Sequence, residues 1–218
     1  MSFGLMRGRD PDVAGVGLDR DDLPPFEAGR FDPRSFFGDP ARPFEIEIGS
    51  GKGTFLLAEA SANPEVNYLG IEQAGEFWRY AADRLRRHGL GNVKVLWGDA
   101  VELLRHRMPD GVARAIHLYF SDPWPKSRHH KRRVLQDRSL EDFRRVLGPG
   151  GELRLVTDHA ELWAWYEAHA ARHADRWERL EFARPTHASE GEIVGTNFER
   201  KFRAEGRSFH AMTLRSRG

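Results

Sequence analysis

One short segment of the chain joins an isolated acid to a dense run of cations. Residues 121–133 read Ser-Asp-Pro-Trp-Pro-Lys-Ser-Arg-His-His-Lys-Arg-Arg. Asp122 lies close to an aromatic residue, Trp124, among prolines that fix the backbone φ angle, which is typical of a small chemical pocket. The eight residues after Pro125 include five Lys or Arg and two His, which favours a polyanionic partner. The segment therefore predicts a functional carboxylate next to a polyanion site.

A glycine-rich turn follows the first apolar run of the chain. Residues 47–54 read Glu-Ile-Gly-Ser-Gly-Lys-Gly-Thr. The absence of Cβ atoms lets a ligand approach the backbone closely at three positions: Gly49, Gly51 and Gly53. A phosphate-binding NTPase loop needs Ser or Thr directly after Lys52, so that class is excluded. A dinucleotide fingerprint would place its third glycine at Thr54, which weakens a nicotinamide site but leaves it open. Glu47 favours S-adenosylmethionine, whose amino group and sulfonium are cationic.

Two more acids follow the next two apolar runs. Glu72 comes about 20 residues after the glycines, where a carboxylate can accept hydrogen bonds from both hydroxyls of a ribose. Both nicotinamide dinucleotides and S-adenosylmethionine predict such an acid. Asp99 is suited to an exocyclic adenine amine, although a helix N-cap is an equal alternative for it. Three acids at successive strand ends predict a nucleoside-binding site.

Apolar runs and helical patterns alternate from residue 44 onward, as in a parallel sheet covered by helices. Strands are expected at seven places: residues 44–48, 66–71, 93–97, 113–120, 152–156, 177–182 and 208–214. Helices are expected between them at residues 54–62, 74–88, 101–107, 139–146 and 160–174. We therefore predict a Rossmann-like α/β fold, in which a mostly parallel seven-stranded sheet has helices on both faces and a C-terminal antiparallel edge. Residues 184–206 are expected to form a long loop.

The amino-terminal segment and the composition set further limits. Residues 1–43 show neither helical nor strand periodicity and are expected to form a flexible arm, with Arg7 and Arg9 as its suggestive cations; residues 44–218 form the domain. The 218 residues include no Cys, which excludes thiolate metal sites and Cys nucleophiles. His129 and His130 are adjacent rather than one helical turn apart, so no metal site is expected. No apolar run approaches the roughly 20 residues of a membrane helix, and a cytoplasmic protein without membrane contact is expected. The net charge is only +1, so any affinity for nucleic acid depends on where the cations lie.

These motifs together resemble the bacterial tRNA (guanine-N7)-methyltransferase family. The resemblance extends from about residue 44 to the C-terminal strands. It rests on Glu47 with the glycine turn, Glu72, Asp99, and the Asp-Pro-Trp-Pro-Lys segment with its basic tail. It also includes Asp158 and the residues Thr196-Asn197-Phe198-Glu199, in which Phe198 replaces the usual Tyr. The family implies a class I methyltransferase fold, S-adenosylmethionine as cofactor, and tRNA as partner, with the variable-loop guanine at tRNA position 46 as target. A monomer or a homodimer is expected.

The resemblance also implies a role for each matching residue. Asp122 is the catalytic residue and also contacts the cofactor. Its carboxylate is expected to accept hydrogen bonds from N1–H and the exocyclic amine of guanine, because N7 already carries a lone pair and needs no general base. Cofactor contacts are expected from Glu47, Gly49, Gly51, Gly53, Glu72 and Asp99. Substrate contacts are expected from Lys126, Asp158, Thr196, Asn197, Phe198 and Glu199, and RNA contacts from Arg128, Lys131, Arg132 and Arg133.

Some alternatives remain open at this level. Asp158 and Glu161 have the spacing of a helix capping box, which would be a structural role. Trp163, Trp165 and Tyr166 are assigned to packing. The chain could methylate another RNA, or it could methylate a small molecule or a protein, in which case the basic run would have no use. More distant alternatives are a nicotinamide-dependent oxidoreductase and a non-catalytic RNA-binding protein.

Overall fold

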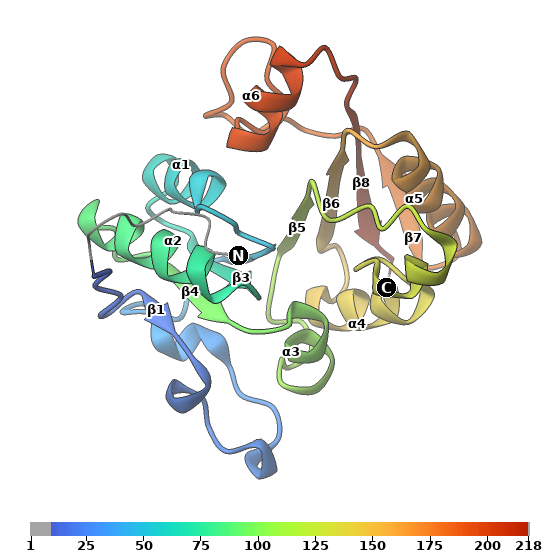
Figure 1. Ribbon diagram of the computed structural model, residues 1–218. Helices are drawn as coiled ribbons and strands as arrows, with labels where there is room; N and C mark the ends of the chain where they lie inside the picture. The colour runs from blue at the N-terminus through green and yellow to red at the C-terminus, as the bar shows by residue number, and fades with distance from the viewer. Residues whose placement is uncertain (1–9, 218) are drawn as a thin grey trace. The chain divides into compact units, whose positions relative to one another are not determined.

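The computed structural model describes residues 10–217, which divide between two compact units, Met1–Met108 and Pro109–Gly218 (Figure 1). Arg7 and Arg9 lie outside the described residues. Strands and helices alternate along the chain in both units.

The first unit contains a four-stranded parallel sheet in the order β1-β4-β3-β2. Its strands are β1 (Gly17–Leu18), β2 (Phe44–Ile48), β3 (Asn67–Glu72) and β4 (Val93–Trp97). Its α-helices are α1 (Thr54–Ala62), α2 (Gly75–Arg87) and α3 (Ala100–His106). Three short 3-10 helices precede β2: η1 (Arg20–Asp22), η2 (Phe26–Ala28) and η3 (Pro33–Phe36).

Helix α2 shows how the sequence pattern builds this unit. Its buried residues recur every three or four positions, so they lie on one face of the helix: Trp78, Ala81, Ala82 and Leu85. That face packs in a core cluster with Val93 and Val95 of β4, and the Trp78 Nε1–H donates to the Val95 carbonyl at 2.9 Å. The helix therefore fixes the position of the β4 carboxyl end.

The second unit contains strands in the order β5-β6-β8-β7. They are β5 (Ala115–Tyr119), β6 (Glu152–Thr157), β7 (Trp177–Leu180) and β8 (His210–Ser216). β5 and β6 are parallel, whereas β8 is antiparallel to both β6 and β7. The helices are the 3-10 helix η4 (Ser127–Arg132) and the α-helices α4 (Asp137–Leu147), α5 (Ala160–Arg172) and α6 (Asn197–Ala204).

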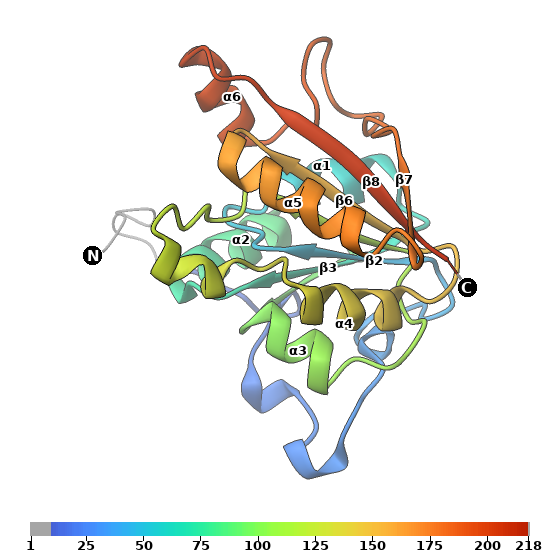
Figure 2. The ribbon, with the colours of Figure 1, turned by 90° about the vertical axis from the view of Figure 1, so that its right-hand side faces the viewer.

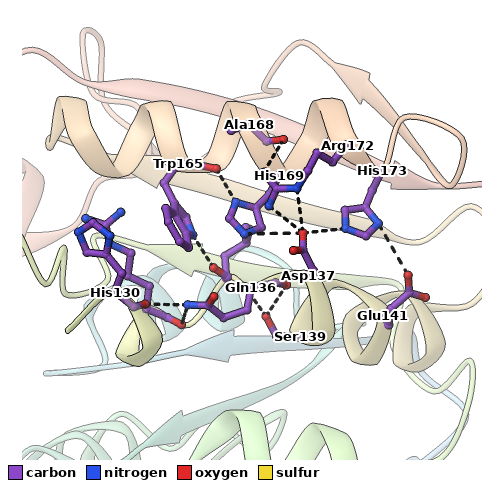
Figure 3. Close-up of polar contacts among 12 residues, drawn as sticks. His130, Gln136, Asp137, Ser139, Glu141, Trp165, Ala168, His169, Arg172 and His173 are labelled. Carbon is purple, nitrogen blue, oxygen red and sulfur yellow. Dashed lines mark hydrogen bonds and ion pairs between the residues drawn. The ribbon is translucent and has the colours of Figure 1, made fainter. Parts of the chain in front are cut away.

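Helix α5 lies along β6 and β8 (Figure 2) and is tied to the start of α4. Asp137 accepts hydrogen bonds from Arg172 Nη2 at 2.8 Å and from the His173 ring at 2.9 Å, as Figure 3 shows. The Trp165 Nε1–H donates to the Leu135 carbonyl at 2.7 Å, just before α4. Helix α5 therefore supports the segment that connects η4 to α4.

The sequence predicted the alternating elements closely, and two differences have local causes. Strand β1 lies in residues 1–43, which we expected to be a flexible arm; Gly17 and Leu18 instead pair with β4, so the described chain has eight strands rather than seven. A two-residue strand has no periodicity to detect, because backbone pairing forms it. Helix α6 lies in the expected loop at residues 184–206, where only two large apolar residues, Phe198 and Phe202, mark its sequence.

Candidate active site

In the first unit, one acid at the end of β3 holds the glycine turn. Gly49, Gly51 and Gly53 all have positive φ angles (77°, 51° and 65°), which favour glycine. Glu72 Oε2 accepts the Gly51 N–H at 2.8 Å, and its Oε1 accepts the Ala74 N–H at 2.8 Å. Both oxygens of this carboxylate thus fix backbone on either side of the strand end. Each oxygen retains a second lone pair that a ligand hydroxyl can use.

A second acid, Glu47 at the end of β2, is buried and incompletely paired. Glu47 is 5% exposed, and among the described residues its Oε2 has no hydrogen-bond partner. Burial raises the pKa of Glu47 well above the usual carboxyl value, and the negative charge of Glu72 raises it further. A cationic ligand group would relieve both effects. These two carboxylates therefore fit the cationic amino group of S-adenosylmethionine.

Asp99 and Trp97 mark the end of β4. Asp99 Oδ1 accepts the Val101 and Glu102 N–H groups at 2.8 and 3.2 Å, so the helix N-cap considered from the sequence is formed. The expected adenine contact remains a prediction, and the exposed Asp99 carboxylate is compatible with it. Sequence reasoning did not single out Trp97, which is 45% exposed and stacks on Trp78 with ring centroids 5.6 Å apart. Its position directly before Gly98-Asp99 was the available signal.

In the second unit, Asp122 lies on a contorted loop after β5. The backbone takes positive φ angles at Phe120 (52°) and Trp124 (42°), which non-glycine residues rarely adopt. The Asp122 side chain is exposed. Its neighbour Ser121 exchanges a hydrogen bond of 2.9 Å with the hydroxyl of Tyr166, which is fully buried in α5. The Asp122 carboxylate is thus exposed to solvent on a loop that the hydrogen bond to Tyr166 holds in place.

The basic residues after this loop divide into two kinds. Lys126, Arg128, Lys131 and Arg132 are exposed in or beside η4. The Arg132 guanidinium lies over the Trp124 ring, 4.9 Å from its centroid. Exposed cations of this kind can contact RNA phosphates.

Arg133 is different, because it is buried. Its side chain is 1% exposed, its Nε donates to the Pro123 carbonyl at 2.8 Å, and its Nη2 lies 2.5 Å from Glu161 Oε1. The RNA contact predicted for Arg133 is therefore not available in this structure. The sequence could not separate it from Arg132, since the two neighbours are the same residue type.

Asp158, at the end of β6, forms an ion pair instead of a helix cap. Its Oδ2 lies 2.5 Å from Arg207 Nη1. The α5 N-cap is His159, whose Nδ1 accepts the Leu162 N–H at 3.3 Å, and Glu161 pairs with Arg133. The capping box considered for Asp158 and Glu161 was therefore wrong. The N-cap lies one residue later than that spacing predicts.

Thr196 and Glu199 stabilise the start of α6. Thr196 Oγ1 accepts the Glu199 N–H at 3.1 Å. Glu199 is fully buried and accepts the backbone N–H groups of three consecutive residues, Ile193, Val194 and Gly195, at 2.5, 2.8 and 2.9 Å. The direct substrate contact predicted for Glu199 is therefore blocked in this structure by its own turn.

The same helix exposes the other two residues of the motif. Asn197 is exposed, and Phe198 is 48% exposed, with its ring 5.9 Å from that of Phe202. Phe198 thus has an aromatic face open to solvent. These two residues remain candidates for substrate contact.

Residues 10–217 were considered for two further features, a metal-binding cluster and a membrane-spanning helix. No cluster of three or more His, Cys, Asp or Glu in these residues could hold a metal ion. None of the helices described is both long and apolar enough to span a membrane.

Comparisons with known proteins agree with one another. The family model described as "Putative methyltransferase" matches residues 41–212. A "tRNA (guanine-N(7)-)-methyltransferase" from Nitrobacter hamburgensis is 40% identical over 87% of this chain and 74% of its own length. A protein of the same name from Streptococcus pneumoniae is 36% identical over 79% of this chain and 81% of its own. A solved SAM dependent methyltransferase from Aquifex aeolicus, 16% identical, has a TM-score of 0.52 over 80% of this chain and 81% of its own, and supports the fold alone.

Proposed function

The chain belongs to the methyltransferase family of these relatives, and on that premise we propose that it transfers a methyl group from S-adenosylmethionine to N7 of a guanine in tRNA. The product is 7-methylguanosine. The expected target is the variable-loop guanine at tRNA position 46. Nothing in this membership supports the nicotinamide-dependent alternative.

The first unit supplies the site for the methyl donor. The observation that carries this assignment is the unpaired Oε2 of buried Glu47, which a cationic amino group would satisfy. Glu72 holds the glycine turn and accepts hydrogen bonds from the ribose hydroxyls. Asp99 accepts a hydrogen bond from the adenine amine. The bound donor provides an electrophilic methyl group on its sulfonium. The chain's own residues only bind and orient it.

The second unit supplies the group that orients the base. Guanine N7 carries an in-plane lone pair, so the displacement requires no proton removal before attack. The exposed Asp122 carboxylate accepts hydrogen bonds from N1–H and the exocyclic amine of guanine, and its negative charge favours the positive charge that develops on the methylated ring. Adenine lacks this pair of donors and would leave the carboxylate unpaired, which gives selectivity for guanine.

The exposed cations bind the tRNA backbone. Lys126, Arg128, Lys131 and Arg132 make phosphate contacts, which fix the register of the RNA without reading its sequence. Asp158 contributes to tRNA binding indirectly, through its ion pair with Arg207. Thr196 and Glu199 also contribute indirectly, because they fix the start of α6, which carries Asn197 and Phe198. Phe198 provides a face on which a base can stack. Because N7 lies in the deep, narrow major groove of paired RNA, a loop guanine is the expected target. We place the enzyme in the cytoplasm with its tRNA substrate.

A methylation assay tests this function. The protein is incubated with labelled S-adenosylmethionine and unmodified tRNA, and the RNA is digested to nucleosides. Label is expected in 7-methylguanosine, and a tRNA with adenine at position 46 serves as the matched control. Label that enters small molecules, protein or another nucleoside would contradict the proposal. Equal 7-methylguanosine from the control tRNA would contradict the target position alone.

A further inference from the structure

Arg133 is the last residue of the basic run, and its burial sets it apart from the other Lys and Arg residues of that run. Its four basic predecessors from Lys126 to Arg132 face solvent, whereas the Arg133 side chain is 1% exposed. A buried guanidinium is costly unless its N–H groups are paired, and this one is paired. Its partners decide what the residue does.

The guanidinium connects two segments of the second unit. Its Nε donates to the Pro123 carbonyl at 2.8 Å, and its Nη2 lies 3.5 Å from the Trp124 carbonyl, so it faces the backbone directly after Asp122. Nη2 also pairs with Glu161 of α5 at 2.5 Å. The Trp165 ring covers the guanidinium, with its centroid 4.8 Å from Cζ.

The backbone of Arg133 is fixed as well. Gln136 Nε2 donates to the Arg133 carbonyl at 3.0 Å and to the His130 carbonyl at 2.8 Å. Figure 3 shows the contact with His130. Arg133 is therefore held at its backbone carbonyl by Gln136 and at its guanidinium by Glu161.

A second anchor lies on the other side of Asp122. The buried Tyr166 hydroxyl bonds to Ser121 Oγ at 2.9 Å. Burial raises the pKa of Tyr166 to about 12, so the hydroxyl stays protonated at neutral pH. Helix α5 thus supplies supports on both sides of Asp122, and the unfavourable φ of Trp124 lies within the supported loop. A strained backbone of this kind persists only where its surroundings determine it.

From these contacts we infer that Arg133 is a positioning residue for Asp122 and not a phosphate ligand. With Glu161 and Trp165, it holds the loop so that the Asp122 carboxylate meets the guanine in one orientation. The inference rests on the proposed role of Asp122. Its consequence is that loss of Arg133 lowers the rate of methyl transfer, whereas loss of Arg132 weakens RNA binding.

The test compares Arg133→Met with Arg132→Met in steady-state methylation and tRNA binding across a salt series. We expect Arg133→Met to lower kcat by about 10- to 100-fold, since a small misplacement of a reacting group costs this much, with Kd for tRNA within twofold of wild type. Arg132→Met should raise KM and Kd and reduce the salt slope by about 0.7 to 0.9, the value of one phosphate contact. A raised Kd and a reduced salt slope in Arg133→Met, with kcat unchanged, would overturn the inference.

A double-mutant cycle separates this inference from the proposed function. If Arg133 acts through Asp122, Asp122→Asn with Arg133→Met should be no slower than Asp122→Asn alone. Multiplying losses would refute positioning while leaving the role of Asp122 intact, and full activity of Asp122→Asn would refute that role itself. Glu161→Gln provides a second test if Arg133→Met does not fold, because Glu161 is half-exposed and its substitution should leave the fold intact. This variant should reproduce part of the kcat loss. An unchanged kcat in Glu161→Gln would count against the inference.

Discussion

The glycine turn of the first unit (residues 49–53) and the loop with Pro123 and Pro125 in the second (the proline loop, residues 121–125) are each held by a charged side chain, and the two charges have opposite signs. Both follow a parallel strand, and a single buried charged side chain fixes each. Glu72 accepts backbone N–H groups around the glycine turn, whereas Arg133 donates to backbone carbonyls of the proline loop. The group that holds the backbone is a carboxylate in the glycine turn and a guanidinium in the proline loop.

The difference teaches how each loop is matched to its ligand. In the glycine turn the holding acid lies near another buried acid, Glu47, and the two carboxylates favour a cation. In the proline loop the holding cation is neutralised by Glu161, so the exposed Asp122 and the exposed cations remain available to the base and the phosphates. In both loops the group that holds the backbone is buried, and a second acid, Glu47 in one and Asp122 in the other, is left for the ligand.

The largest effect is expected when the presented acid of the proline loop is neutralised. Asp122→Asn puts an amide donor opposite the guanine donors, so we expect kcat to fall about 10²-fold, as for loss of one group that stabilises transition-state charge. Steady-state methylation of tRNA measures this. Asp175→Asn, at an exposed acid of the same unit, is the control and should keep wild-type kcat. Equal rates for the two variants would remove Asp122 from the mechanism.

Neutralising the acid that holds the glycine turn should have the next largest effect. In Glu72→Gln, one of the Gly51 and Ala74 N–H groups must face an amide donor, which costs about 1–3 kcal/mol in the free energy of unfolding. The Kd of S-adenosylmethionine should rise about tenfold or more, since a loss of ~1.4 kcal/mol is tenfold. Urea unfolding and calorimetric titration measure the two quantities. Glu102→Gln, at an exposed position of α3, is the control. A Glu72→Gln protein indistinguishable from it would show that the turn does not need the acid.

Glu47 should make the first unit sensitive to pH. Its folded pKa lies above the unfolded value of about 4.5, so the folded state holds the proton more tightly. The free protein then loses stability as pH rises from about 4.5 until Glu47 ionises in the folded state. Glu47→Gln should lack this decline in urea unfolding between pH 4.5 and 8. If its stability follows the same pH curve as wild type, Glu47 is not the group that titrates.

The same group should couple donor binding to proton release. A cationic amino group favours ionised Glu47, so binding of S-adenosylmethionine should release a proton and tighten as pH rises. Calorimetric titration in two buffers of different ionisation enthalpy measures the proton count. Glu47→Gln should bind more weakly and release fewer protons. Identical proton counts for wild type and Glu47→Gln would contradict the coupling.

The smallest effect is expected at Phe198, where the motif departs from the family. Its exposed ring can stack on a base, so Phe198→Ala should raise KM for tRNA about fivefold, the equivalent of ~1 kcal/mol. Phe198→Tyr keeps the ring and should remain within twofold of wild type. A larger change in Phe198→Tyr than in Phe198→Ala would assign the effect to a hydroxyl rather than to stacking.

Local patterns were sufficient for most elements of the fold. Strand β2, helix α1 and strand β4 begin and end where the periodicity predicts, because each is longer than one repeat of its own pattern. Strand β1 is too short for such a signal, and α6 has only two large apolar side chains, of which Phe198 is exposed, so its sequence shows no apolar face. The residue types at the strand ends also predicted the class of donor, since acids beside glycines favour a cationic nucleoside.

The sequence by itself determined the order of most strands and helices, the family, and the acids at the strand ends. Only the tertiary structure decided which charged residues serve the fold and which remain available to a ligand. Arg132 and Arg133 are adjacent and identical in type, yet one is exposed and the other lies beneath Trp165 against Glu161, 28 residues away in the chain. Glu199 is likewise used up by its own turn. Burial depends on segments distant in sequence, and the partner of a buried charge cannot be read from its neighbours.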